Sequence, residues 1–197
     1  MKWEDALKDY KYYLNLERGL SKNSVESYSL DIIKLIRFLE NNNIKESPIS
    51  INSKTIKEFI YQVAKVINER SQARLISGLK SFFNYLLFED YRNDNPLELI
   101  ESPKTGRKLP DTLSLKDIDK LSSAVDLSKP EGERNRAIIE TLYGCGLRAS
   151  ELTNLKLSDL FFEEGFIKVT GKGNKERFVP IGPWTQKYIS IYRNEIR

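Results

Sequence analysis

Residues 144–152 read GCGLRASEL, and this stretch decides how the second half of the chain folds. The pattern from about Glu133 to Tyr143 predicts a helix that ends at the glycines, with a new helix starting within a few residues. The turn sets the Arg148 guanidinium beside a helix N-terminus, where free N–H groups favour an anion. Glu151 follows one turn later and can orient the guanidinium. Two interpretations stay open. The junction is either an anion site or a structural Arg–Glu pair that stabilises a tight turn, and the spacing alone favours the structural pair.

A β-hairpin is predicted downstream of this junction. Residues 166–170 and 177–181 are short alternating runs that flank the glycine-rich tip GKGNKE. A flexible lysine on such a tip can reach into a groove and give a proton to a leaving oxygen. A solvated turn is the ordinary alternative, because lysine and glycine are common at exposed loops. The cations in question are Lys172, Lys175 and Arg177.

The first hundred or so residues predict an all-α bundle of four helices. Apolar residues recur there at three- and four-residue spacing, and no glycine-flanked alternating strand interrupts them. Ser21, Ser53 and Ser71 stand where they can cap the second, third and fourth helices. Expected inward positions include Tyr10, Ile32, Leu35, Phe59, Leu79 and Phe82.

A proline-bracketed basic run, residues 102–110, predicts a linker between this bundle and a second unit. Ser114 and Asp117 form an acidic capping box that begins the second unit with a helix. The final stretch from Trp184 looks helical and ends without a cap. Because a two-stranded hairpin is marginal on its own, we expect the chain to be cut in the middle of a domain.

Composition excludes several classes of chemistry. The 197 residues carry 32 Lys+Arg against 28 Asp+Glu, a formal net charge of +4, which permits a nucleic-acid partner without requiring one. The absence of histidine removes Ser-His-Asp and Cys-His catalysis and histidine-ligated metals. Cys145 is expected to be a small buried residue rather than a nucleophile. Neither a signal peptide nor a membrane-length apolar run is present, so the cytoplasm is the expected location.

The two segments together resemble the tyrosine site-specific recombinases, most closely the bacterial XerC/XerD integrase/recombinase group. Arg148 with ASEL after it, and then the hairpin TGKGNKER at 170–177, carry the resemblance. It extends over essentially the whole chain. Further matches are Leu20–Ser24 with Tyr28 and Asp31, Arg74–Phe83, Asn95-Pro96, Pro103-Lys104 and Leu109-Pro110.

The resemblance implies a multi-domain fold. Residues 1–104 would form an all-α core-binding domain, a SAM-like four-helix unit that clamps DNA. Residues 105–111 would be the linker. Residues 112–197 would be the N-terminal part of an α+β catalytic domain with a small hairpin or sheet.

The resemblance also implies DNA strand cleavage and rejoining with no metal and no other cofactor. In the family a tyrosine attacks a backbone phosphate, which gives a 3′-phosphotyrosyl link and a free 5′-hydroxyl. By motif, Arg148 is the first arginine, Lys172 the proton donor to the 5′-oxygen, and Glu151 the residue that steers Arg148. We expect Arg148 to be partly buried and ordered, and Lys172 to be mobile.

The sequence departs from the family toward its C-terminus. The His-x-x-Arg segment, a later His/Trp position and the tyrosine nucleophile are not found, and the ten tyrosines lack the expected context. The expectation is therefore a truncated recombinase that binds DNA but does not cleave it by itself.

Partners follow from the same resemblance: a double-stranded DNA recombination site and other recombinase protomers, as a tetramer on DNA, with no membrane and no nucleotide. The protein would be nucleoid-associated and would act in chromosome partition during the cell cycle or in mobile-element integration. The alternatives are a DNA-binding regulator without catalysis and a helical protein–protein interaction module. Expected DNA contacts are Arg70, Arg74, Lys80, Lys175 and Arg177.

Overall fold

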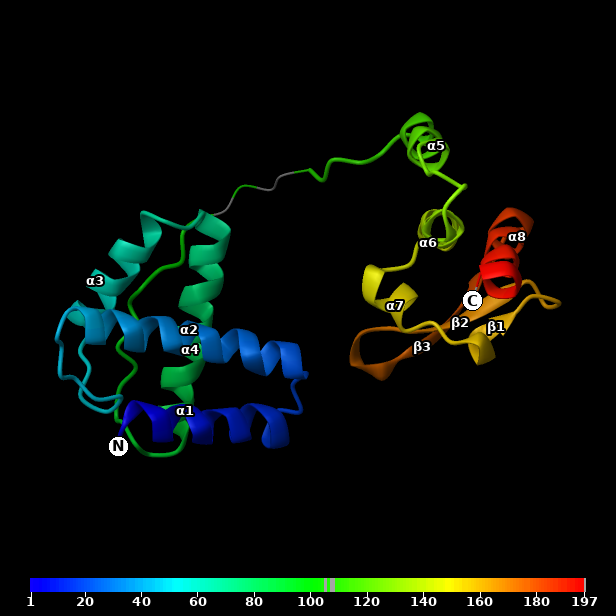
Figure 1. The fold of residues 1–197 in the computed structure, drawn as a ribbon. Helices are drawn as coiled ribbons and strands as arrows, with labels where there is room; N and C mark the ends of the chain where they lie inside the picture. The colour runs from blue at the N-terminus through cyan, green and yellow to red at the C-terminus, as the bar shows by residue number, and fades with distance from the viewer. Residues whose placement is uncertain (105, 107–108, 197) are drawn as a thin grey trace. The chain divides into compact units, whose positions relative to one another are not determined.

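The computed structural model describes residues 1–104, 106 and 109–196, with side chains left out at positions 130 and 172. The chain divides into two compact units, residues 1–108 and 109–197, each of which is described by itself (Figure 1). The linker expected over residues 105–111 lies partly outside the described residues. None of the described helices is long and apolar enough to cross a membrane.

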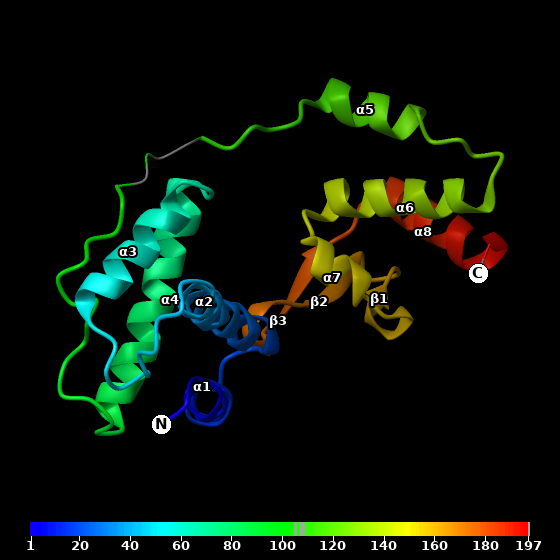
Figure 2. The same ribbon diagram turned by 60° about the vertical axis from the view of Figure 1, so that its left-hand side comes forward.

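The first unit is a four-helix bundle, as predicted. Helices α1 and α2 lie side by side and α4 runs across them (Figure 2). A single core of buried side chains joins them, with Tyr10 against Phe82 and Phe38 against Phe59. The first hundred residues contain no strand. The helices are α1 (Trp3–Tyr12, continued by a π-helical turn, Tyr13–Glu17), α2 (Lys22–Asn41), α3 (Ser53–Ala64) and α4 (Glu69–Phe88).

Caps explain where these helices begin. Ser21 caps α2 by accepting a hydrogen bond from the backbone N–H of Ser24, as predicted. The other two predicted caps are wrong. Asn52, one residue before the predicted Ser53, caps α3, and Asn68 caps α4, which starts before the predicted Ser71. Asparagine satisfies the exposed N–H groups of a first turn as well as serine does, so the earlier residue takes the role.

The second unit combines helices with a small antiparallel sheet. Ser114 and Asp117 form the predicted capping box at the start of its first helix. The elements are α5 (Leu115–Ser123), α6 (Pro130–Cys145), α7 (Ala149–Thr153), a 3-10 turn (Leu157–Asp159), β1 (Leu160–Phe161), β2 (Phe166–Thr170), a tip turn (Lys172–Asn174), β3 (Glu176–Pro180) and α8 (Pro183–Ile191, continued by a π-helical turn, Tyr192–Ile196).

The sheet has the order β1-β2-β3, so the predicted hairpin gains a third strand. Ile167 and Val169 on β2 point into a small core that Cys145, Leu147 and Ile181 complete. Helices α6 and α8 pack side by side (Figure 2). The core ties the end of α6 to the sheet, which brings the helix junction close to the hairpin.

Candidate active site

The junction between α6 and α7 is built as the glycines predict. Helix α6 ends at Cys145, and Gly146 follows in the left-handed conformation with φ of 59°, where a side chain would be strained. Two residues later Arg148 is extended, with φ of −75° and ψ of 152°, and α7 starts at Ala149. Because α7 has only five residues, the anion-binding capacity of the junction depends on the Arg148 side chain rather than on a helix dipole.

Glu151 is the buried centre of this junction, with 4% of its surface exposed. Its Oε2 accepts from the backbone N–H of Arg148 at 2.9 Å, and its Oε1 accepts from Nη1 of Arg148 at 2.9 Å. Arg177 on β3 donates through Nη1 to Oε1 at 2.7 Å and through Nη2 to Oε2 at 2.9 Å. The hydrogen bonds from Arg177 first, and from Arg148 next, hold the pKa of Glu151 well below its ordinary range.

The expected partial burial of Arg148 is wrong, because 71% of its side chain is exposed. The acid is buried instead of the base. One nitrogen of the guanidinium is bound by Glu151, and the remaining N–H groups make no hydrogen bond to any described residue. A guanidinium steered on one edge and open on the other can bind two oxygens of a phosphate.

The hairpin tip lies next to this pair. Gly171 donates its N–H to the carbonyl of Lys175 at 2.8 Å, and Gly173 and Asn174 turn the chain with positive φ. A Cβ at Gly171 would lie 3.2 Å from Oε1 of Glu151 and 3.3 Å from Nη1 of Arg177. Lys175 is exposed at the tip. The Lys172 side chain, for which mobility was expected, lies outside the described residues.

In the first unit, Arg74 is held by a buried acid. Its guanidinium donates to both carboxylate oxygens of Asp31 and, at 2.9 Å, to the hydroxyl of Ser27. Asp31 is completely buried, while 48% of the Arg74 side chain is exposed. Burial raises the pKa of Asp31, and the hydrogen bonds from Arg74 oppose that rise.

The other two cations expected on α4 have different surroundings. Arg70 is exposed and donates to the backbone carbonyl of Gly106 at 3.1 Å. Lys80 is half-buried and lines a hollow of about 470 Å³ together with Arg18, Ser77 and Asn84. Arg18 was not among the sequence candidates, because it lies on no helix face that the periodicity could identify.

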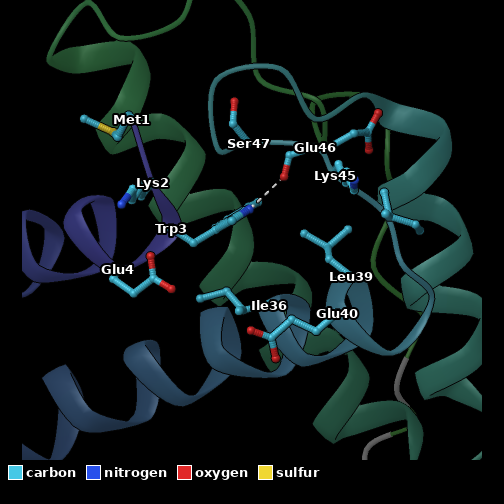
Figure 3. Close-up of a pocket in the computed structure, with 11 residues that line it drawn as sticks. Met1, Lys2, Trp3, Glu4, Ile36, Leu39, Glu40, Lys45, Glu46 and Ser47 are labelled. Atoms are coloured by element: carbon cyan, nitrogen blue, oxygen red, sulfur yellow. Dashed lines mark hydrogen bonds between the residues drawn. The ribbon is translucent and has the colours of Figure 1, made fainter.

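A second hollow of about 330 Å³ opens beside the chain's first residues (Figure 3). Trp3 lines it and donates its ring N–H to the carbonyl of Glu46 at 2.9 Å. Its walls mix apolar residues of α2 with Glu4 and Glu40. It contains none of the sequence candidates. The described residues hold no group of three His, Cys, Asp or Glu side chains that could bind a metal.

Cys145 is buried, as predicted, with 8% of its surface exposed. Burial raises the pKa of its thiol, so the thiolate needed for nucleophilic attack is disfavoured. The described side chains at this junction therefore offer cations and a carboxylate rather than a nucleophilic thiol.

Comparison with known proteins matches both units to one family. Residues 111–196 match the Phage integrase family, and residues 7–90 match the N-terminal SAM-like domain of phage integrases. The chain is 36% identical over 194 residues to Tyrosine recombinase XerD of Listeria innocua, covering 98% of this chain and 65% of that protein. It is 38% identical over 195 residues to Tyrosine recombinase XerD of Staphylococcus saprophyticus, covering 98% and 66%.

A crystal structure of the lambda integrase bound to DNA has the same fold, with a TM-score of 0.75 and 19% identity over 98% of this chain and 67% of that one. The chain spans about two thirds of the length of the curated relatives that it matches. The first unit matches the N-terminal domain of phage integrases and the second unit matches the integrase family itself. The match to the recombinase of Listeria innocua runs over 98% of the chain. The chain belongs to the phage integrase family.

Proposed function

We propose that this chain supplies the DNA-binding unit and part of the catalytic site of a site-specific recombinase. The observation that carries the proposal is the Arg148–Glu151 pair. A buried acid holds a mostly exposed arginine by one edge, next to the hairpin whose tip bears Lys172. Membership of the phage integrase family suggests the reaction in which such a pair would act, the cleavage and rejoining of DNA strands.

In the proposed reaction a tyrosine oxygen attacks a backbone phosphorus. A phosphotyrosyl bond to the 3′ side forms, the bond to the 5′-oxygen breaks, and Lys172 gives that oxygen its proton. Arg148 binds two non-bridging oxygens and stabilises the charge that grows on them in the transition state. The bond energy is kept in the covalent link, so rejoining needs no nucleotide.

We propose a recombination site in double-stranded DNA and further recombinase protomers as the partners. The lambda integrase has been solved as a tetramer bound to a Holliday junction, with a TM-score of 0.72 to this chain. The proposed phosphate contacts are Arg70 and Lys175, which are exposed, and Arg74 and Lys80, which are partly exposed.

We further propose that these 197 residues by themselves bind DNA without cleaving it. Among the tyrosines, Tyr10 and Tyr85 are buried in the first unit's core, where burial raises their pKa values above the ordinary range. In the terminal helix, Tyr188 stacks on Trp184 and contacts the guanidinium of Arg136 on α6. Tyr192 lines a hollow whose lining residues do not include Arg148.

A duplex with a nick beside the scissile phosphate tests the proposal, because the nick traps any covalent intermediate. We expect salt-dependent binding and no covalent adduct from the 197 residues. Joined to a C-terminal segment that carries the family's His-x-x-Arg and tyrosine, the chain should form the adduct, and Arg148→Ala should abolish most of it. Binding with no adduct from the joined protein would instead indicate a DNA-binding regulator. An adduct from the 197 residues alone would identify one of their own tyrosines as the nucleophile.

A further inference from the structure

The positive charge of Arg177 is paired with a buried carboxylate of the protein, that of Glu151. Both of its terminal nitrogens donate to Glu151, at 2.7 and 2.9 Å, in a side-by-side arrangement of guanidinium and carboxylate. About 40% of the Arg177 side chain is exposed, but its paired edge faces an acid that is almost completely buried. A charge neutralised in this way contributes less to DNA binding than the exposed Lys175 two residues earlier.

The Glu151 carboxylate is fully occupied as a result. Oε1 accepts from one nitrogen of Arg148 and one of Arg177, and Oε2 accepts from the Arg148 backbone and the second nitrogen of Arg177. A carboxylate accepts about four hydrogen bonds. Arg148 can therefore place one side-chain nitrogen on Glu151 and not two, which leaves its other N–H groups free for a phosphate.

Gly171 permits this packing. A Cβ at that position would approach both the Glu151 carboxylate and the Arg177 guanidinium to 3.3 Å or less, closer than ordinary van der Waals contact. Gly171 directly precedes Lys172 in the chain. The backbone that leads into the tip is therefore seated against the same carboxylate that holds Arg148.

We propose that Arg177 is a positioning residue rather than a DNA contact. Its hydrogen bonds to both carboxylate oxygens of Glu151 leave Arg148 room for only one side-chain hydrogen bond there. The same hydrogen bonds hold the hairpin that carries Lys172 against the helix junction. The inference rests on the proposed function for its purpose, but the contacts and their effect on Arg148 can be measured without DNA.

The experiment compares Arg177→Met and Arg177→Lys with the matched control Lys175→Met, which removes a cation from the same hairpin without touching Glu151. Carbon NMR of the Glu151 carboxyl group gives its pKa, and nitrogen NMR of the Arg148 side chain reports its hydrogen bonding. Arg177→Met should raise the pKa of Glu151 by about one pH unit or more. It should also shift the Arg148 Nε–H signal, as Arg148 takes the vacated oxygen with its second nitrogen.

Arg177→Lys should keep part of the effect on the pKa of Glu151, because the charge remains. It should still shift the Arg148 signal, because an ammonium cannot span both oxygens. Lys175→Met should change neither. If Arg177→Met unfolds the second unit, seen in the amide signals of β2 and β3, the Arg177→Lys protein supplies both measurements. A Glu151 pKa and an Arg148 signal that match the unsubstituted protein in the folded variants would overturn the proposal.

Duplex binding at two salt concentrations separates this inference from the proposed function. Lys175→Met should lower the affinity of the chain for DNA and lower the salt slope by about one, as expected for one lost phosphate contact. Arg177→Met should leave the salt slope nearly unchanged, because Arg177 contacts Glu151 rather than phosphate. An unsubstituted chain that binds no DNA would refute the proposed function and leave the NMR result to decide the role of Arg177.

Discussion

Gly78 on α4 lies so close to the carboxylate of Asp31 on α2 that a Cβ at residue 78 would overlap Oδ2. The missing side chain lets the two helices approach and leaves room for Arg74, one turn earlier on α4, to reach both oxygens of the acid. The hydrogen bonds from Arg74 explain how a carboxylate is tolerated in the bundle's core.

Gly78→Ala tests this close approach. In an open helix the change would stabilise the protein by about 0.5–1 kcal/mol, because alanine is the better helix former. Here we expect a loss of about 1–3 kcal/mol in the free energy of unfolding, because the methyl group must displace the buried carboxylate. Denaturant titration measures it, with Gly106→Ala as control, since nothing lies within 4 Å of a Cβ at residue 106. A more stable Gly78→Ala protein would contradict the close packing.

Asp31 also distinguishes Arg74 from Arg70, although both arginines were predicted from the sequence as DNA contacts. Arg74→Met leaves Asp31 buried without its partner, so we expect a loss of about 2 kcal/mol of stability, less than for a fully buried pair because half of Arg74 faces solvent. Arg70→Met should change stability by less than about 0.5 kcal/mol, because Arg70 is exposed.

Both substitutions should weaken DNA binding. Arg70→Met should lower the salt slope by about one, and Arg74→Met by less, because Asp31 partly neutralises the charge of Arg74. Unfolding curves and duplex titrations on the same two proteins give the comparison. Equal stability of the two variants would show that the Asp31–Arg74 pair does not hold the bundle, and an unchanged salt slope would remove that arginine from the proposed DNA contacts.

Local patterns predicted the elements of this fold well. Three- and four-residue spacing located all four helices of the first unit, and Ser114 with Asp117 located the start of α5. Strand β1 was missed because two residues, Leu160 and Phe161, are too few to show alternation. The caps of α3 and α4 were misplaced because several serines and asparagines near each helix start can all serve.

Pairing between distant residues was not predictable. The local pair, Arg148 and Glu151, was foreseen because the two residues are three positions apart, about one helix turn. Arg177 is 26 residues from Glu151, and Arg74 is 43 residues from Asp31. No periodic pattern links such positions, so both arginines were taken as free cations for DNA. Which acid a base meets depends on how the elements pack, and for these two arginines the partner is a buried carboxylate.

The low pKa of Glu151 makes the junction sensitive to acid in a defined direction. The ordinary pKa of this side chain is 4.5, and hydrogen bonds from Arg177 and Arg148 lower it in the folded chain. A carboxylate with a lowered folded pKa stabilises the fold fully above its ordinary pKa and loses that contribution as the pH falls toward the folded value. The substitution Glu151→Gln removes the carboxylate charge at every pH.

The difference in unfolding free energy between the unsubstituted and Glu151→Gln proteins should therefore be constant from about pH 6 to pH 8 and narrow progressively below about pH 4.5. Denaturant titrations across pH 3–8 measure that difference. Glu164→Gln, which removes an exposed carboxylate between β1 and β2, serves as control and should change stability little at any pH. A difference that stays constant down to pH 3 would mean that Arg148 and Arg177 do not bind the charged form of Glu151. A difference that narrows as described would show that the charged form of Glu151 stabilises the folded chain through its hydrogen bonds with Arg148 and Arg177.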